Sequence, residues 1–331
     1  MKVAVLSFAH ERAATYARLL HEAADVDLAV ADPGHEGRGS AVAAELGATY
    51  FGGWEEVFAW GPDAVVVTAE ATGQRPLVER AALAGAHVLC ERPFADDEAD
   101  AEAMVDACER AGVRLRLASP VAYGPAFAAV RAELAKEDVM GGLTTVYGAL
   151  NPPLPRSPER GVLDACAPYL LDLVDAVLGG QPAQEVYAQA NSVLGGDPDV
   201  ASAALLTVRY ADSTVLSLDC SWGVADRGPG VEGPVVTFVG ERASVEFSAA
   251  PRLIGGFDSA GAGERWVTRG DDPYAVMLAA FLAGVRGGAD TGPDGAAGLR
   301  ALRIVRAARE SVRTGQPVEP ATAPAVPAAS G

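Results

Sequence analysis

A charged dipeptide and a proline follow a short apolar run near residue 90. The run 88–90 shows no polar alternation, which predicts a central strand covered on both faces. Pro93 has no N–H for a strand ladder, so the strand must end before it and leave Glu91 and Arg92 at its carboxyl end. Ligands of open α/β sheets bind at that end. The two side chains could therefore polarise or clamp an oxygen of a small molecule, although a solvated ion pair in an ordinary strand-to-helix turn has the same sequence.

Histidine and lysine are scarce, which restricts the acid–base chemistry that this chain can perform. The lysines are Lys2 and Lys136, and no histidine follows His87. Proton transfer in the second half must therefore use Asp, Glu, Tyr or Cys, or borrow a group from the first half.

Charge and cysteine usage exclude several classes of partner. The 331 residues include 44 acidic and 26 basic side chains, a net charge of −18 that disfavours nucleic acid and anionic membranes and favours a small organic partner. Four widely spaced cysteines without a C-x-x-C pair predict neither a disulfide framework nor a metal site, and are typical of buried thiols in a cytoplasmic protein. We find no signal peptide and no apolar stretch long enough to span a membrane.

Strand and helix patterns alternate through the first half. Strands are predicted at 2–7, 26–31, 63–68, 88–90 and 113–118, and helices at 11–24, 38–46, 54–60, 73–84, 96–111 and 125–135. This alternation predicts an α/β Rossmann domain, a doubly wound parallel sheet with right-handed crossovers, over residues 1–120.

The pattern changes near residue 140. A strand at 144–151, a Pro-rich loop at 152–158 and a helix at 161–178 precede strands at 184–193, 200–210, 214–222, 235–239 and 243–247. Strands in succession predict an α+β domain over 121–316 with an open antiparallel sheet, whose uncovered face would form a homodimer or homotetramer contact. The helices at 273–285 and 295–313 are expected to pack back towards the first domain, and the Pro/Ala-rich tail 317–331 is expected to be disordered.

Three motifs in this order resemble the Gfo/Idh/MocA oxidoreductases, the glucose-fructose oxidoreductase and inositol dehydrogenase family, over about residues 1–318. Glu91-Arg92-Pro93 resembles the family's Glu-Lys-Pro signature, and residues 84–90 resemble its Ala-Gly-x-His-Val-Leu-Cys lead-in. Residues 161–168 resemble the start of its Asp-x-x-x-His helix, with Asp164 in register. The resemblance implies a Rossmann domain for NAD or NADP and a sheet domain that holds a sugar, a cyclitol or a related small molecule.

The same resemblance assigns the cofactor positions. The family's Gly-rich turn reads Ser7, Ala9 and Arg12 here, which predicts weaker binding than three glycines would give. Asp32 would hold the ribose hydroxyls and slightly favour NAD, whereas Arg38 could meet the 2′-phosphate of NADP. The complete set of predicted cofactor residues is Ser7, Phe8, Ala9, Arg12, Asp32, Arg38, Thr68, Glu70, Gln74 and Glu91.

The catalytic pair of the family is replaced. Arg92 stands at the lysine position, and an arginine polarises an oxygen but is a poor proton shuttle. Pro168 stands at the histidine position and carries no proton. The predicted catalytic residues are therefore Arg92 with Asp164, Tyr169 and Asp172 on the following helix.

Three functions remain open at this point. The first is an NAD(P)-dependent oxidoreductase that uses Arg92 as electrophile and Asp164 or Tyr169 as acid–base group. The second is an enzyme of the same fold that has left hydride transfer, such as a lyase, an epimerase or a cyclase. The third is a non-catalytic binding homologue, because fold alone does not fix function.

Overall fold

The chain folds into two compact units. The computed structural model describes residues 1–34, 37–155, 160–194, 197–223, 233–249, 252–258, 263–289 and 291–320. The first unit combines Met1–Tyr123 with Pro273–Leu302, and the second combines Gly124–Asp272 with the chain from Arg303 onward.

The first unit is built on a parallel sheet in the order β3-β2-β1-β4-β5-β6. Its strands are β1 (Lys2–Leu6), β2 (Asp27–Ala31), β3 (Thr49–Phe51), β4 (Ala64–Val67), β5 (His87–Cys90) and β6 (Leu115–Leu117). Its helices are α1 (Ala13–Glu22), α2 (Arg38–Leu46), α3 (Trp54–Ala59), α4 (Ala71–Leu83), α5 (Glu98–Ala111), α6 (Pro120–Tyr123) and α10 (Pro273–Val285). Alternate residues of each strand face opposite sides, so both sides of this sheet are apolar.

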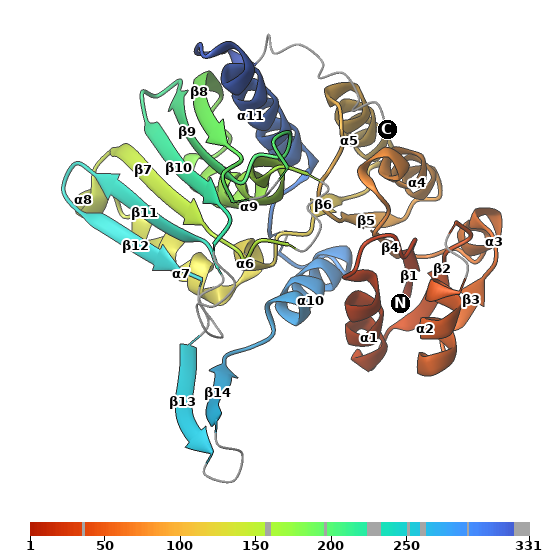
Figure 1. Cartoon of the computed structure of the whole chain (residues 1–331). Coiled ribbons are helices and arrows are strands. Elements are labelled where there is room, and N and C mark those ends of the chain that lie inside the picture. The colour runs from red at the N-terminus through yellow and green to blue at the C-terminus, as the bar shows by residue number, and fades with distance from the viewer. Residues whose placement is uncertain are drawn as a thin grey trace. The chain divides into compact units, whose positions relative to one another are not determined.

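Each side of the parallel sheet has its own core. On one side, Val65, Val67 and Val88 pack with side chains of α4 and α5. On the other side, Val5 and Val66 pack with side chains of α1 and α10. The two layers of helices are visible around the sheet in Figure 1, as expected of a doubly wound fold.

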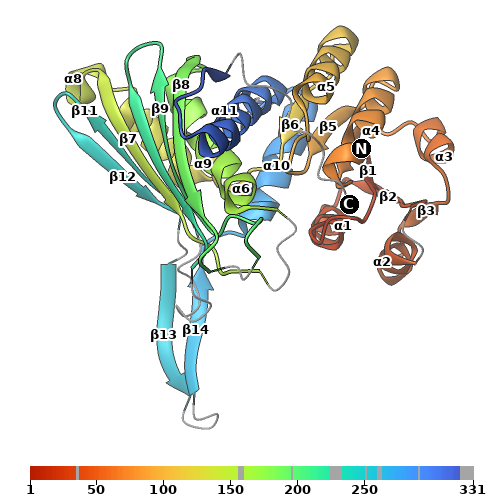
Figure 2. The ribbon, with the colours of Figure 1, turned by 45° about the horizontal axis from the view of Figure 1, so that its top comes forward.

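The second unit is built on a mixed sheet in the order β12-β11-β7-β10-β9-β8. Its strands are β7 (Leu143–Leu150), β8 (Ala183–Asn191), β9 (Ala203–Tyr210), β10 (Val215–Ser221), β11 (Val235–Gly240) and β12 (Ser244–Ser248). A separate two-stranded hairpin, β13 (Arg252–Asp258) with β14 (Gly263–Arg269), extends the unit in Figure 2. The helices are α7 (Pro125–Leu134), α8 (Glu137–Met140), α9 (Val162–Leu178) and α11 (Gly295–Thr314), whose first part belongs to the first unit.

Helix α9 packs against the central strands β7, β10 and β9. Along β9 and β10, buried residues that face the helix side alternate with more exposed residues on the other side. The approach is close at Gly148 of β7, where an added Cβ atom would lie 2.6 Å from a methyl carbon of Leu218 and 3.3 Å from one of Leu170. The opposite face carries the exposed side chains of Tyr147 and Leu205. Within the described parts of the chain, helices therefore cover one face of this sheet and leave the other open.

The predicted fold class is confirmed, with one correction to the second sheet. Strands β7 and β10 pair in parallel, whereas the other neighbours in this sheet are antiparallel. The sequence also gave no indication of β3, α6, α8 and the hairpin β13–β14. Residues 156–158 of the Pro-rich loop and residues 321–331 of the tail lie outside the described residues.

All four cysteines are buried free thiols, as the composition predicted. Burial raises the pKa of Cys108 to about 11 and that of Cys166 to about 12. Burial also raises the pKa of Cys90 and Cys220 above the ordinary thiol value. In the described parts of the chain, no helix has the length and apolar character needed to cross a bilayer, and no three potential metal ligands gather into a group.

These buried thiols predict a loss of stability at alkaline pH. Each thiol stays protonated in the folded state but ionises above about pH 8.5 in the unfolded chain, so the unfolded state binds fewer protons. The free energy of unfolding should therefore decrease by about 1.4 kcal/mol per pH unit for each such thiol, once the pH exceeds the unfolded pKa. Urea unfolding under reducing conditions from pH 7 to 10 measures this slope. Cys166→Ala should make the pH dependence of the free energy of unfolding shallower by the contribution of one thiol. An unchanged slope in that variant would contradict the argument.

Candidate functional site

Four parallel strands of the first unit end at one level. Leu6 of β1 pairs with Ala31 of β2 and with Val67 of β4, and Val67 pairs with Cys90 of β5. The residues that follow are Ser7, Asp32, Thr68 and Glu91, all of them predicted site residues. The sheet register therefore brings together side chains that are far apart in the sequence.

Ser7 has the backbone conformation that normally requires glycine. Its φ angle is 73°, in the left-handed region. The turn is held because Ser7 N–H donates to Ala31 O at 2.8 Å and Thr68 Oγ1 donates to Ser7 O at 2.7 Å. The first position of the Gly-rich turn has thus kept its backbone shape without its glycine, at a cost of about 1 kcal/mol.

Four N–H groups between Ser7 and α1 have acceptors in the loop or at neighbouring strand ends. Phe8 donates to Asp32 Oδ1 at 2.9 Å, and His10 donates to Thr68 O at 3.1 Å. Ala9 donates to Ser7 Oγ at 3.3 Å, and Arg12 donates to His10 Nδ1 at 3.2 Å. Bonds of the last two lengths are at the weak end of the range, so a phosphate oxygen could replace either acceptor. Because Ser7 and Ala9 are also small, this loop fits the pyrophosphate of a dinucleotide.

Asp32 links β2 to two neighbouring segments. One carboxylate oxygen accepts from Phe8 N–H, and the other accepts from Gly39 N–H at 3.2 Å. The residue is only 2% exposed, and a Cβ atom at Gly39 would lie 2.5 Å from Asp32 Cβ. Arg38 is exposed at the start of α2 and donates to Phe8 O at 3.4 Å. The carboxylate and the guanidinium predicted to select the cofactor thus flank the same loop.

Glu91 turns its carboxylate inward. It is 2% exposed; Oε2 accepts from the Tyr16 hydroxyl, and Oε1 accepts from Arg92 N–H at 2.9 Å. Tyr16 is a buried residue of α1, and nothing in the sequence indicates this contact. Glu91 therefore holds the start of its own turn in addition to its predicted place beside the cofactor.

The remaining predicted residues of the first unit differ in exposure. Arg92 follows Glu91 and is 5% exposed, and a cis peptide bond joins it to Pro93. Thr68 and Gln74 are fully buried, whereas Glu70 is exposed at the start of α4. Gln74, predicted as a cofactor contact, donates to main-chain carbonyls beside Arg92.

In the second unit, α9 carries the other predicted catalytic residues. The helix runs from Val162 to Leu178 and continues through Pro168. Asp164 forms a bidentate ion pair with Arg309 of α11, in which Arg309 Nε donates to Oδ2 at 3.1 Å and Nη2 donates to Oδ1. Tyr169 is half-buried and Asp172 is buried, and three residues apart they share one face. Nothing in the sequence indicates Arg309 as the partner of Asp164.

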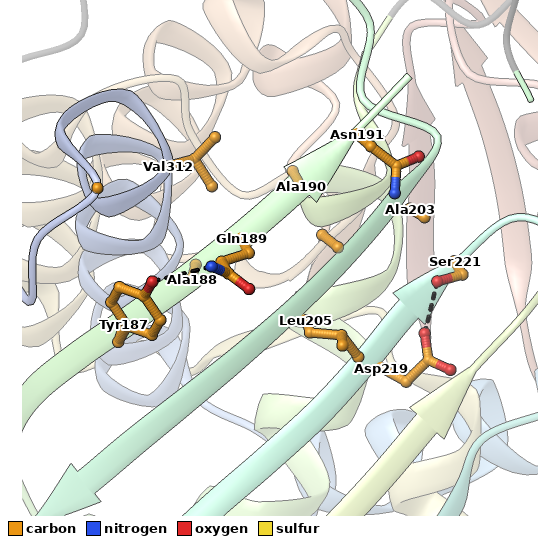
Figure 3. A pocket seen from close by; sticks show the side chains of 12 residues that line it. Tyr187, Ala188, Gln189, Ala190, Asn191, Ala203, Leu205, Asp219, Ser221 and Val312 are labelled. Carbon is orange, nitrogen blue, oxygen red and sulfur yellow. Dashed lines mark hydrogen bonds between the residues drawn. The ribbon is translucent and has the colours of Figure 1, made fainter. Parts of the chain in front are cut away.

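A shallow cavity that the sequence did not predict lies on the open face of the second sheet. Its volume is about 610 Å³, and it extends over β8, β9 and β10 to the end of α11. Figure 3 shows its polar side chains, among them Tyr187 with Gln189 and Asp219 with Ser221, which form hydrogen bonds of 3.0 and 2.6 Å. The predicted site residues are not among its lining.

The fold and the strand-end site define a class of protein, the nicotinamide-dependent oxidoreductases with a Rossmann domain. Residues 7–119 match a family model described as "Oxidoreductase family, NAD-binding Rossmann fold", and residues 142–246 match the "GFO/IDH/MocA C-terminal domain". The predicted cofactor class, NAD or NADP, is thereby confirmed.

Curated relatives agree with both matches. The chain is 30% identical over 295 residues to a D-apiose dehydrogenase of Paraburkholderia graminis, covering 81% of this chain and 76% of that protein. It is 30% identical over 292 residues to a myo-inositol dehydrogenase of Streptomyces leeuwenhoekii, covering 80% and 83%. The chain belongs to the Gfo/Idh/MocA family, as its motifs predicted.

Solved structures share the fold over nearly the whole chain. GenD2 from gentamicin A biosynthesis, in complex with NAD, superposes with a TM-score of 0.83 at 22% identity and covers 96% of both chains. The scyllo-inositol dehydrogenase of Lactobacillus casei, with NAD(H) and scyllo-inositol, has a TM-score of 0.81 at 15% identity and covers 97% of this chain and 99% of its own. At these identities the similarity establishes the fold.

Ser7 provides a direct test of the cofactor loop. Ser7→Gly should relieve the left-handed backbone strain, so that stability is unchanged or rises by up to about 1 kcal/mol. It should also free Ala9 N–H from Ser7 Oγ and tighten NADH binding about 3- to 10-fold, because that N–H then becomes available to a phosphate. Calorimetric titration with NADH measures the affinity.

Ser213 supplies the matched control, because it lies in the β9–β10 turn with a φ angle of 71°. Ser213→Gly should change stability in the same direction and leave NADH affinity unaltered. Equal affinity in Ser7→Gly and wild type would show that the serine does not limit phosphate binding.

Proposed function

We propose that this protein is an NAD(P)-dependent dehydrogenase of a sugar, a cyclitol or a related hydroxylated small molecule. A nicotinamide cofactor, when bound, would supply the acceptor for the hydride that leaves the substrate carbon. Arg92 would hold and polarise the reacting oxygen, and a side chain of α9 would move the hydroxyl proton. Family membership supports the reaction class, and the substrates named for the two curated relatives, a pentose and an inositol, support the substrate class.

The cofactor would occupy the strand-end site. In this proposal Ser7, Phe8, Ala9 and Arg12 hold the diphosphate, and Thr68, Glu70 and Glu91 lie towards the nicotinamide ribose. Asp32 and Arg38 lie towards the adenosine ribose, where a buried carboxylate favours the two hydroxyls of NAD over the 2′-phosphate of NADP. Gln74 lies beneath this surface, where it donates to the main-chain carbonyls of Glu91 and Pro93.

The ion pair between Asp164 and Arg309 is the observation that carries the choice of proton-transfer group. A carboxylate held on both oxygens by a guanidinium is a poorer proton acceptor than a free one, because the cation stabilises the charged form. Pro168 has no proton to exchange. We therefore assign the proton transfer to Tyr169, with Asp172 on the same helical face as the neighbouring polar group.

Loss of the lysine and histidine also favours a second candidate. An Arg92 that clamps a carboxylate or a carbonyl would suit a lyase, an epimerase or a cyclase that does not turn over NAD. A non-catalytic binding homologue would keep the fold and the polar site without turnover.

Reduction of NAD⁺ or NADP⁺, followed at 340 nm with pentoses, hexoses and inositols, tests the proposal. Wild type should turn over at least one of these substrates. Arg92→Ala should lower kcat/KM by about 100-fold or more and Tyr169→Phe should lower kcat by about 100-fold, with NADH affinity retained, because both remove interactions with the reacting oxygen.

Asp164→Asn tests whether Asp164 or Tyr169 of α9 transfers the proton. It should reduce stability by about 1 kcal/mol, since the ion pair is only partly buried, and leave kcat within a few-fold of wild type. Tyr187→Phe, on β8 of the same unit, is the matched tyrosine control and should leave kcat unchanged. A folded but inactive Asp164→Asn together with an active Tyr169→Phe would assign the relay to Asp164, and NADH binding without turnover would favour the second candidate.

We further propose that two copies, or two pairs of copies, associate through the open face of the β12–β8 sheet. Four large apolar side chains are exposed there, Tyr147, Leu205, Val215 and Val235, on neighbouring strands. Apolar surface of this kind is typical of an interface between subunits.

Light scattering after gel filtration tests the association. Wild type should have the mass of a dimer or tetramer, and Leu205→Asp should shift it towards the monomer because a carboxylate would be buried without a partner. Exposed Leu83 of α4 belongs to the first unit, so Leu83→Asp should leave the mass unchanged. A monomeric wild type would overturn the proposal.

A further inference from the structure

One side chain holds the main chain on both sides of Arg92. Gln74 Nε2 donates to Glu91 O at 2.9 Å and to Pro93 O at 2.8 Å, the two carbonyls that flank the arginine. The third acceptor in reach, Ala69 O after β4, is 3.4 Å away. An amide nitrogen has two hydrogens, so the two short bonds use both of them well.

The orientation of this amide follows from its surroundings. Gln74 Oε1 accepts from the Cys90 thiol, which is a donor. If the amide were rotated by 180°, its oxygen would face the carbonyl oxygens of Glu91 and Pro93, and like partial charges would repel. The direction of the Gln74 side chain is therefore set by three groups of the segment Cys90 to Pro93.

Because these hydrogen bonds are buried, losing them would cost free energy that water cannot restore. Gln74 is 0% exposed and lies in the first turns of α4, so its position is fixed by the packing of that helix against the sheet. The carbonyls of Glu91 and Pro93 lie beyond the end of β5, where the chain has left the strand ladder. A buried carbonyl that loses its donor costs about 1 to 3 kcal/mol, so the segment would rearrange rather than leave both without donors.

We propose that Gln74 is a positioning residue for the reaction: it fixes the backbone of the Glu91-Arg92-Pro93 turn and thereby the direction in which Arg92 leaves the strand. The proposal rests on the role of Arg92 in the proposed function. It moves Gln74 from the cofactor surface to the support of the catalytic arginine, and it makes the start of α4 part of the active-site framework.

The informative variant is Gln74→Met, which keeps the length of the side chain and removes both N–H donors. Turnover, measured as kcat/KM, should fall about 30-fold or more, while the Kd for NADH stays within about 3-fold. Gln74→Glu should behave in the same way, because a carboxylate would face two carbonyl oxygens. The control is Val78→Ala, which lies one helical turn further along α4, is also fully buried and, as a valine, has no side-chain hydrogen-bond donor to lose. It should reduce stability without changing kcat/KM by more than about 3-fold.

A double-mutant cycle separates positioning from general loss of structure. If Gln74 acts through Arg92, then adding Gln74→Met to Arg92→Ala should cause no further loss of turnover. Independent, multiplying losses would overturn the proposal, as would a Gln74→Met enzyme with wild-type turnover.

Hydrogen exchange keeps the test decisive if the wild type shows no dehydrogenase activity. Amides of residues 91–95 should exchange about 10-fold faster in Gln74→Met than in wild type, whereas those of residues 7–13 should be unchanged. Unchanged exchange at residues 91–95 would overturn the positioning role. Faster exchange there in a protein without NAD(P)-linked turnover would retain it and reject the proposed function alone.

Discussion

The register of β1, β2, β4 and β5 is the constraint on which the rest of the site depends. Four strands that stop at one level release their main-chain polar groups together, at an edge where the ladder no longer satisfies them. Side chains that follow the strands take over, and Asp32, Thr68 and Glu91 each bond to main-chain groups of this edge. The carboxylates and the hydroxyl that are predicted to contact a ligand therefore also close the fold at this edge.

The parts of the fold that depend on local sequence patterns could be predicted from the sequence. Apolar runs and helical periodicity located most strands and helices, and the order of motifs identified the family. Pairing between distant strands was less accessible: nothing in the period-2 pattern of β7 and β10 distinguishes a parallel from an antiparallel neighbour. The hairpin β13–β14 was missed because no alternating run marked it as a pair of strands.

The site illustrates the same limit at the level of side chains. Residue types at the strand ends were predicted, but their partners lie far along the chain: Asp32 meets Phe8 across 24 residues, Tyr16 meets Glu91 across 75, and Asp164 meets Arg309 across 145. Those pairings decide whether a carboxylate is available for chemistry or already committed to an internal donor. An acid on a helix cannot be assigned a catalytic role from its spacing alone, because the arginine that occupies it belongs to another helix.

The division of the chain between its two units bears on how the protein is made. Met277, Leu278 and Phe281 of α10 complete the core on one side of the parallel sheet, yet they are separated from Tyr123 by the whole of the second sheet in sequence. During synthesis from the N-terminus, the ribosome releases β1 to β6 long before α10 exists. The first unit must therefore wait with the part of this face that α1 does not cover still exposed while the intervening strands emerge, and its core closes only near the end of translation.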